Sequence, residues 1–316
     1  MLINIILLGI GFVVLIKGAD FFVDGASGIA ANFKVSKMLI GLTIVAFGTS
    51  APEFAVSVKS LISGSGDMVL GNVIGSNILN ILLIIGCSAM FHSLTVKNNT
   101  IKKELPITLM ITMAFAVLLS DSIWDKSLNN ILSRGDGLTL ILFFGVFLYY
   151  LIKMTRNKVE EEKDEDAISI KRAIIYTVIG LAGIVLGSNI VVDSAAKIAS
   201  ILGVSERMIS LTIIALGTSL PELVTSVAAT RKGEFDIAIG NVVGSNIFNI
   251  GMVIGIPVAI FGSINAISFS YLDLLVMITS AILLFMFSFN DTKISRKEGF
   301  IFLLLFVAYY SYVIVA

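Results

Sequence analysis

The stretch Thr43-Ile-Val-Ala-Phe-Gly-Thr-Ser-Ala-Pro-Glu53 is repeated almost unchanged as Thr212-Ile-Ile-Ala-Leu-Gly-Thr-Ser-Leu-Pro-Glu222. The two copies lie 169 residues apart (212 − 43 = 169). Each is followed by a second repeated segment, Gly-Asn-Val-Ile-Gly-Ser-Asn-Ile-Leu-Asn at 71–80 and Gly-Asn-Val-Val-Gly-Ser-Asn-Ile-Phe-Asn at 240–249. The chain is therefore built from two related halves.

Both copies of the first segment end in a proline and a glutamate within an otherwise apolar run. These pairs are Pro52-Glu53 and Pro221-Glu222. An ionisable residue inside an apolar span marks a functional site by default. Two of them at equivalent positions predict a transporter with its site between two halves. A purely structural role for both glutamates is the less favoured interpretation.

The composition is that of an integral membrane protein. The 316 residues are 57% hydrophobic and 14% charged, the net charge is zero, and the mean hydropathy is +0.99. Soluble domains carry about 25% charged residues. No charge excess points to a nucleic-acid partner. The single cysteine, Cys87, cannot form an internal disulfide and is expected to be a packing residue.

The apolar runs predict an all-α, polytopic protein. A membrane-crossing helix needs roughly 20 mostly apolar residues. The N-terminal run counts as a helix rather than a leader, because Gly18 and Asp24 recur as Gly187 and Asp193. The ten expected spans are 2–30, 38–62, 68–91, 103–120, 135–153, 171–200, 206–230, 236–261, 269–289 and 297–315. They form one transmembrane domain, 1–316, with repeats 1–153 and 171–316 joined by a charged linker, 154–170.

The distribution of lysine and arginine orients these spans. If the linker is cytoplasmic, most of the lysines and arginines are cytoplasmic too. The outer set is then limited to Lys59, Lys126, Arg134, Lys197 and Arg207. Both termini are thus predicted to be extracellular. Because each half has an odd number of spans, the halves enter the membrane from opposite sides as inverted repeats.

The segment Gly48 to Glu53 is expected to interrupt its helix. Proline removes a backbone donor and clashes with the carbonyl four residues before it. A kink or local unwinding near residues 46–50 would free carbonyl oxygens, which is tolerated at membrane depth where they line a cavity. Thr49, Ser50 and Glu53 then supply further oxygens and a negative charge. The second half offers the same set in Thr218, Ser219 and Glu222.

The second repeated segment is expected to form another wall of the site. Ser76 and Asn80 share a helix face because they are four residues apart, and Ser245 and Asn249 repeat this spacing. The neighbouring glycines are expected to allow close helix approach: Gly71, Gly75, Gly240 and Gly244.

The pooled side chains are hard oxygen donors. They suit Ca²⁺, which takes about six to eight oxygen ligands. Two glutamates neutralise one Ca²⁺, and the same oxygens can hold Na⁺, so competition between the two ions is a basis for exchange. Zinc, copper and iron are disfavoured because no thiolate or imidazole cluster is present. Protons are expected to compete at low pH. Asp20, Asp24 and Asp193 are interpreted as interfacial anchors, ahead of a role in ion access.

At these residues the chain resembles the sodium/calcium exchanger branch of the cation/calcium exchanger superfamily. The two pairs of repeated segments are similar to that family's alpha repeats. The resemblance implies electrogenic exchange of several Na⁺ for one Ca²⁺ by alternating access, with the first and sixth helices sliding across the others. It also implies a cation site formed by side chains and two backbone carbonyls: Ala46, Thr49, Ser50, Glu53, Ser76, Asn80, Ala215, Thr218, Ser219, Glu222, Ser245 and Asn249.

Three departures refine this expectation. Asn249 stands where potassium-dependent relatives carry aspartate, which disfavours K⁺ co-transport. The short linker leaves no room for a regulatory domain, as expected of a prokaryotic form. The proton/calcium branch typically has a glutamate where this chain has Gly75 and Gly244.

The sequence therefore predicts a Na⁺/Ca²⁺ antiporter of the cell membrane with no cofactor, for which a monomer suffices. A H⁺/Ca²⁺ antiporter is the alternative, and other divalent ions stay open as substrates. A passive cation channel is less favoured, since the chain carries its own internal symmetry. An enzyme is disfavoured because no His-Glu-x-x-His motif or Ser/His dyad is present at membrane depth.

Overall fold

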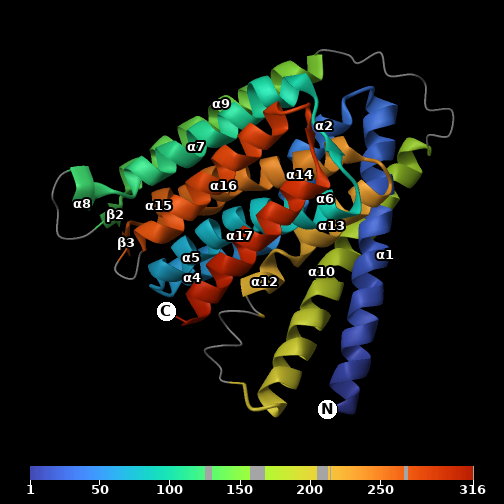
Figure 1. The fold of residues 1–316 in the computed structure, drawn as a ribbon, viewed down its shortest axis with the longest axis horizontal. Helices are drawn as coiled ribbons and strands as arrows, with labels where there is room; N and C mark the ends of the chain where they lie inside the picture. Colours follow the sequence, from blue (N-terminus) through green and yellow to red (C-terminus); the bar gives the residue numbers. More distant parts are fainter. Residues whose placement is uncertain (125–129, 157–167, 205–212, 214, 267–269, 316) are drawn as a thin grey trace.

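The computed structural model describes residues 1–124, 130–156, 168–204, 213, 215–266 and 270–315 (Figure 1). The described chain is mostly helical, as expected for the all-α class. In the first half the elements are α1 (Leu2–Phe33), α2 (Lys37–Ile40), η1 (Gly41–Val45), α3 (Ala46–Thr49), α4 (Ala51–Ile62), α5 (Gly66–Leu79), η2 (Asn80–Ile85), α6 (Gly86–Phe91), β1 (Leu94–Thr95), η3 (Thr100–Glu104), α7 (Leu105–Leu118), α8 (Asp121–Trp124), β2 (Asn130–Leu132) and α9 (Arg134–Arg156), where η marks a π-helical turn.

The second half repeats this order. Its described elements are α10 (Ile170–Ile201), α12 (Ala215–Thr218), α13 (Leu220–Arg231), α14 (Phe235–Phe248), η5 (Asn249–Ile254), α15 (Gly255–Phe261), β3 (Ile264–Ala266), α16 (Tyr271–Phe289), β4 (Lys293–Ile294) and α17 (Arg296–Val315). The π-helical turns η2 and η5 begin at Asn80 and Asn249, which are equivalent positions of the two halves. Such turns often occur at functional sites.

Within the described residues, seven helices are long and apolar enough to cross a membrane, and a bent helix pair, Lys37–Thr49 with Ala51–Ile62, would make an eighth. The expected spans at 103–120 and 206–230 are not among these helices. Most of 205–214 lies outside the described residues. Most of the linker 154–170 is also outside them. The structure thus establishes a multi-pass protein and leaves the count of ten as a prediction.

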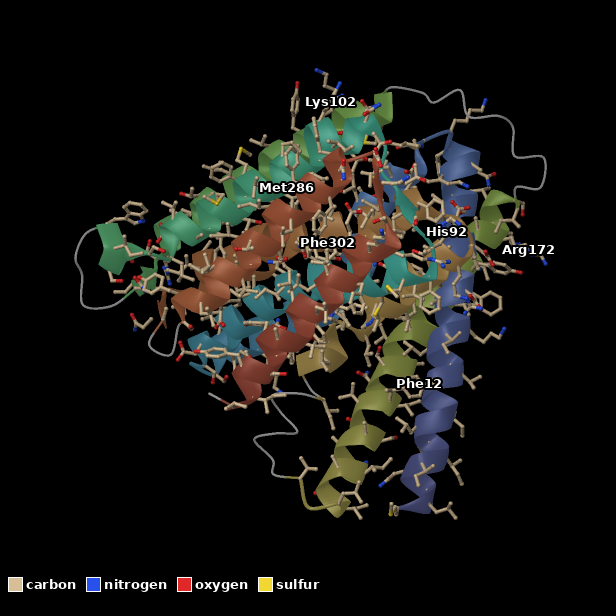
Figure 2. All side chains as sticks on the ribbon, in the orientation of Figure 1. Phe12, His92, Lys102, Arg172, Met286 and Phe302 are labelled. Atoms are coloured by element: carbon tan, nitrogen blue, oxygen red, sulfur yellow. The ribbon has the colours of Figure 1, made fainter. Side chains whose placement is uncertain are left out.

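Large apolar side chains cover much of the outer surface. Phe12 on α1 is 43% exposed and Met286 on α16 is 56% exposed (Figure 2). Phe302, in contrast, is fully buried against Phe287. An apolar exterior of this kind is suited to lipid contact, since the bilayer core offers no hydrogen-bonding partners.

Two short antiparallel strand pairs connect the halves. Leu94 pairs with Ile294 in β1–β4, and Ile131 pairs with Asn265 in β2–β3. The β1 and β4 loops were both predicted to be cytoplasmic, and the β2 and β3 loops to be external. Each strand pair therefore joins loops that the sequence assigns to the same side of the membrane, which agrees with the alternation of the predicted spans.

The two 32-residue helices, α1 and α10, run side by side at one edge of the molecule (Figure 1). Glycines bring them together. A Cβ atom added at Gly18 would lie 2.7 Å from the backbone nitrogen of Ile184, and one at Gly180 would lie 2.4 Å from that of Phe22. Contacts this short leave no room for a side chain, so the close approach depends on both glycines.

Among the described long helices, α14 is the most buried, and its glycines behave as predicted. A Cβ atom at Gly240 would lie 3.0 Å from the Cα atom of Gly41, and one at Gly244 would lie 2.7 Å from the Cβ atom of Ala46. For Gly71 and Gly75 the expectation stays a prediction, since no described atom lies within 4 Å of an added Cβ atom there. Their equivalent partner segment, around 207–215, lies largely outside the described residues.

Candidate cation site

The helix breaks occur at equivalent serines. The pair α2–α4 bends by 44° where Ser50 separates α3 from α4. Ser50 has φ −83° and ψ 2°, and Ser219, between α12 and α13, has φ −89° and ψ 4°. Pro52 and Pro221 lie in the first turn of the following helices, where a missing backbone donor is tolerated. The kink predicted for residues 46–50 is confirmed.

These breaks direct two carboxylates into the interior. Glu53 and Glu222 are each 1% exposed. The hydroxyl of Ser50 donates to Oε1 of Glu222 at 3.2 Å. Both carboxylate oxygens of Glu53 and Oε2 of Glu222 are buried with no hydrogen-bond partner, and within the described residues no lysine or arginine pairs with either group. A buried carboxylate without a partner is costly unless a cation neutralises it.

The first segment of each half contacts the second segment of the other half. The Thr49 hydroxyl lies 3.0 Å from Oδ1 of Asn241, and Oγ of Ser219 lies 3.4 Å from Oγ of Ser76. The predicted walls of the site therefore meet, and these two contacts join one repeat to the other.

A buried cluster of amides completes the centre. Nδ2 of Asn80 donates to Oδ1 of Asn246 at 2.9 Å, and Nδ2 of Asn246 donates to the carbonyl of Asn77 at 3.4 Å. The amide oxygens of Asn80 and Asn249 and the hydroxyl of Ser245 are buried without a hydrogen-bond partner. Buried polar atoms are normally satisfied, so this concentration of acceptors requires a physical reason.

Sequence reasoning missed a second role of the repeated segments. Nδ2 of Asn72 donates to the backbone carbonyl of Glu53 at 3.2 Å and to Oγ of Ser57 at 3.0 Å. Nδ2 of Asn241 does the same for Glu222 at 3.3 Å and for Ser226 at 2.9 Å. Both asparagines thus hold the backbone that carries a glutamate. The signal was present, since the first asparagine of Gly-Asn-Val recurs in both copies.

The expected carbonyl ligands are described to different extents. The carbonyl of Ala46 accepts the backbone N–H of Ser50 at 3.0 Å, and the Thr49 hydroxyl lies 3.3 Å from it. The kink therefore does not free this carbonyl. Ala215 begins α12, but its side chain and surroundings lie outside the described residues.

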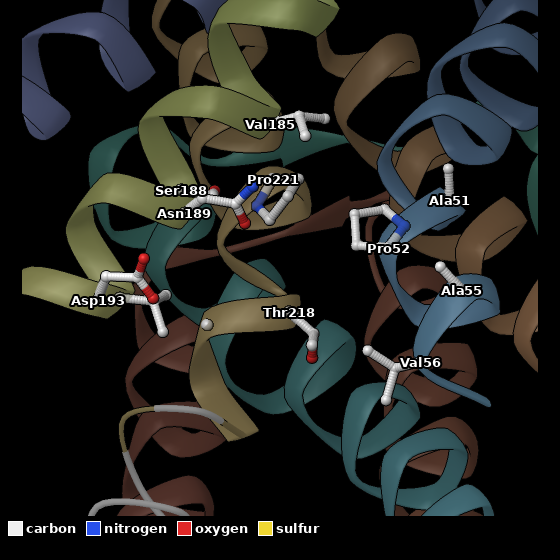
Figure 3. Close-up of a pocket in the computed structure, with 12 residues that line it drawn as sticks. Ala51, Pro52, Ala55, Val56, Val185, Ser188, Asn189, Asp193, Thr218 and Pro221 are labelled. Atoms are coloured by element: carbon white, nitrogen blue, oxygen red, sulfur yellow. The ribbon is translucent and has the colours of Figure 1, made fainter. Parts of the chain in front are cut away.

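A cavity of about 520 Å³ adjoins the site (Figure 3). Pro52 and Pro221 face it from opposite sides, together with Thr218 from α12. Ser188, Asn189 and Asp193 line it from α10 (Figure 3). The cavity thus reaches the proline of each Pro-Glu pair.

The three outlying aspartates have different surroundings. On α1, Oδ1 of Asp24 lies 2.7 Å from Nζ of Lys232, and Asp20 contacts the same ammonium through its carbonyl at 2.7 Å. These contacts fit the predicted anchoring role. Asp193 instead lines the cavity, where no lysine or arginine of the described residues pairs with it.

The donor set suits a hard cation. The site consists of carboxylate, hydroxyl and amide oxygens, and no group of three His, Cys, Asp or Glu side chains gathers anywhere in the described chain. The only histidine, His92 (Figure 2), directly follows α6 and stacks on Phe235. Oxygen donors without thiolate or imidazole favour ions such as Ca²⁺ and Na⁺ over zinc or copper.

The chain matches known proteins over nearly its whole length. The sequence profile described as sodium/calcium exchanger protein matches residues 3–153 and 172–315. CaxA of Alkalimonas amylolytica is 39% identical over 323 residues, which cover 98% of both chains. The sodium/calcium exchanger MaX1 of Methanosarcina acetivorans is 31% identical over 343 residues, covering 97% of both.

Solved structures share the fold. A structure of the sodium-calcium exchanger NCX_Mj, soaked with zero Na⁺ and Ca²⁺, superposes with a TM-score of 0.85 at 31% identity and covers 99% of both chains. A second, soaked with 10 mM Na⁺ and zero Ca²⁺, gives 0.84 at 32% identity over 98% of both.

Proposed function

The chain belongs to the sodium/calcium exchanger family of cation/calcium antiporters, and we propose that it exchanges Na⁺ for Ca²⁺ electrogenically by alternating access. The proposal rests chiefly on one observation: Glu53 and Glu222 are buried, and their carboxylates have no basic partner in the described structure. Together they supply two negative charges, which one Ca²⁺ neutralises.

We assign the transported ions to the oxygens around these two carboxylates. Hydroxyls and amides of both halves complete the shell, with two backbone carbonyls. The proposed ligands are Ala46, Thr49, Ser50, Glu53, Ser76, Asn80, Ala215, Thr218, Ser219, Glu222, Ser245 and Asn249. All of these ligands are oxygens rather than thiolates or imidazoles. The same groups can therefore bind Ca²⁺ and, after it leaves, Na⁺.

The same carboxylates give H⁺/Ca²⁺ exchange a physical basis as a second candidate. A buried carboxylate that lacks a hydrogen-bond donor, as Glu53 does, can also be neutralised by a proton. Gly75 and Gly244, in place of the proton branch's glutamate, favour Na⁺ as the coupling ion.

The proposal includes ten spans in two inverted repeats with both termini extracellular. It is supported by the two strand pairs, which join loops assigned to the same side, and by the basic residues near the linker. Alternating access then requires one part of the molecule to move against the other around a fixed site.

The deciding experiment is radioactive Ca²⁺ uptake into proteoliposomes preloaded with Na⁺, with choline-loaded vesicles as the control. Uptake that needs internal Na⁺ and responds to an imposed membrane potential is expected for electrogenic exchange. Uptake that ignores Na⁺ but follows a pH gradient would replace Na⁺ by H⁺ as the coupling ion.

A further inference from the structure

We propose that Asp193, Asn189 and Ser188 of α10 form an outer waiting site for a hydrated divalent cation in the cavity beside the central site. This inference rests on the proposed function, since the cation that waits there is the one transported. It assigns a role to a long helix that contributes none of the proposed central ligands.

The three side chains form one wall of the cavity (Figure 3). Asn189 and Asp193 are four residues apart and share a helix face. Ser188 is 5% exposed, and its hydroxyl is buried with no hydrogen-bond partner. The wall therefore offers a carboxylate, an amide and an unsatisfied hydroxyl, all oxygen-bearing groups.

The other half of the protein shows what this helix face can hold. The equivalents of Asn189 and Asp193 are Asp20 and Asp24 on α1 (189 − 169 = 20; 193 − 169 = 24). Those two residues bind the ammonium of Lys232. Its Nζ lies 2.7 Å from Oδ1 of Asp24 and donates to the carbonyl oxygen of Asp20 at 2.7 Å. A positive charge thus already occupies this face on α1.

Among the described residues, no lysine or arginine plays that part on α10. The position equivalent to Lys232 is Ser63 (232 − 169 = 63). Asp193 accordingly has no basic partner among the described residues, although it faces a cavity large enough for a hydrated ion. We infer that a mobile cation takes the place that the Lys232 ammonium fills in the first half.

The position of the cavity connects this site to the central one. Its remaining walls include Pro52, Pro221 and Thr218. All three belong to the two repeated motifs that end in Glu53 and Glu222. A cation held at Asp193 therefore shares a cavity with Pro52 and Pro221, the residues that directly precede the two glutamates.

A site of this composition should bind cations weakly and should prefer divalent to monovalent ions. One carboxylate with neutral oxygens attracts a divalent ion about twice as strongly as a monovalent ion at the same distance. In a half-open cavity such attraction raises the local ion concentration, and salt screens it. The site should thus favour Ca²⁺ capture at low ionic strength without contributing to tight binding.

The test measures the KM for Ca²⁺ on one membrane face at a time. Right-side-out vesicles loaded with Na⁺ receive Ca²⁺ from the outer side, and inside-out vesicles receive it from the cytoplasmic side. Asp193→Asn is compared with Asp193→Glu, which keeps the charge. Asp121→Asn is the matched control, because it removes one charge on the predicted outer side while Asp121 does not line the cavity.

We expect Asp193→Asn to raise the outer KM about three- to tenfold at low ionic strength, with a similar maximal rate. The difference should vanish at high choline chloride, and Asp193→Glu should restore the wild-type value. The inner KM should not change, and Asp121→Asn should match the wild type on both faces.

An unchanged outer KM in Asp193→Asn, or an equal change at high salt or on both faces, would overturn the waiting site. Failure of the proposed function is recognised separately, because wild-type vesicles would then show no Na⁺-dependent uptake at all. If a proton gradient drives that uptake instead, the same variants are compared under that gradient, and the same outcomes decide.

Discussion

The hydroxyl of Ser50 donates a hydrogen bond to Oε1 of Glu222 although the two residues are 172 positions apart in the chain. The break in one half thus supports the carboxylate of the other. Ser50→Ala should weaken Ca²⁺ binding by about 1 kcal/mol, the typical contribution of such a bond. The measurement is the KM for Ca²⁺ in proteoliposomes. Ser63→Ala serves as a control at an exposed serine that follows α4, and an equal effect there would contradict the assignment.

The carboxylates themselves should be indispensable. Glu53→Gln leaves the buried site one charge short and should abolish Ca²⁺ uptake, and Glu222→Gln should do the same. Glu298→Gln, at the start of α17 and hydrogen-bonded to Ser295, is the control for loss of a carboxylate elsewhere. Near-normal Ca²⁺ flux in Glu53→Gln, with normal expression and thermal stability, would disprove the assignment of the central site.

The two backbone-holding asparagines should differ in importance. Asn241 supports Glu222 and also accepts the Thr49 hydroxyl at 3.0 Å, whereas Asn72 has no such additional partner among the described bonds. Asn241→Ala should therefore raise the KM for Ca²⁺ more than Asn72→Ala does. The difference should correspond to about 1 kcal/mol of additional lost binding free energy. Thr49→Val should reduce the gap between them. Equal effects with Thr49 intact would show that the Thr49 contact is unimportant.

The amide at position 249 should influence ion selectivity. Both polar atoms of the Asn249 side chain are buried without a hydrogen-bond partner. Asn249→Asp would add a negative charge there and should strengthen cation binding or introduce sensitivity to K⁺. Uptake measured across Na⁺, K⁺ and Ca²⁺ concentrations tests this expectation. An unchanged ion profile would mean that this position does not set selectivity.

The α1–α10 contact should tolerate no added methyl group at its closest points. Gly18→Ala places a Cβ atom 2.7 Å from the backbone nitrogen of Ile184, while Gly9→Ala has nothing within 4 Å. Overpacking of this kind lowers the free energy of unfolding by about 1–3 kcal/mol. Thermal denaturation in detergent should therefore show a lower midpoint for Gly18→Ala than for Gly9→Ala. Equal midpoints would indicate a loosely packed pair.

The sequence predicted those parts of the fold and site that depend on residues close together in the chain. The glutamates, the small residues before each proline and the long apolar runs identify the membrane class and the kinks, because proline and burial act on the residues beside them. The same local rules found the close approach of α14 through Gly240 and Gly244.

Contacts between distant segments were not predictable in the same way. The Asn80–Asn246 and Thr49–Asn241 bonds depend on how the halves pack, which no spacing rule states. The Ala46 carbonyl stays hydrogen-bonded although a proline follows, because the backbone N–H of Ser50 donates to it and the Thr49 hydroxyl lies beside it. Asp193 and Asp24 read alike in the sequence, and only the position of Lys232 distinguishes them.

The strand pairs described above have a mechanical consequence. β1–β4 and β2–β3 cross-link the halves at two separate places, and the ion pair between Lys37 and Glu234, at 2.8 Å, adds a third tie. Neither strand pair involves α1 or α10, and Nδ2 of Asn32 at the end of α1 bonds to the carbonyl of Ile168 just before α10, at 2.8 Å. If α1 and α10 move together in the proposed alternating access, these three ties can keep the two glutamates in place, whereas the contacts of Lys232 with Asp20 and Asp24 on α1 would have to break.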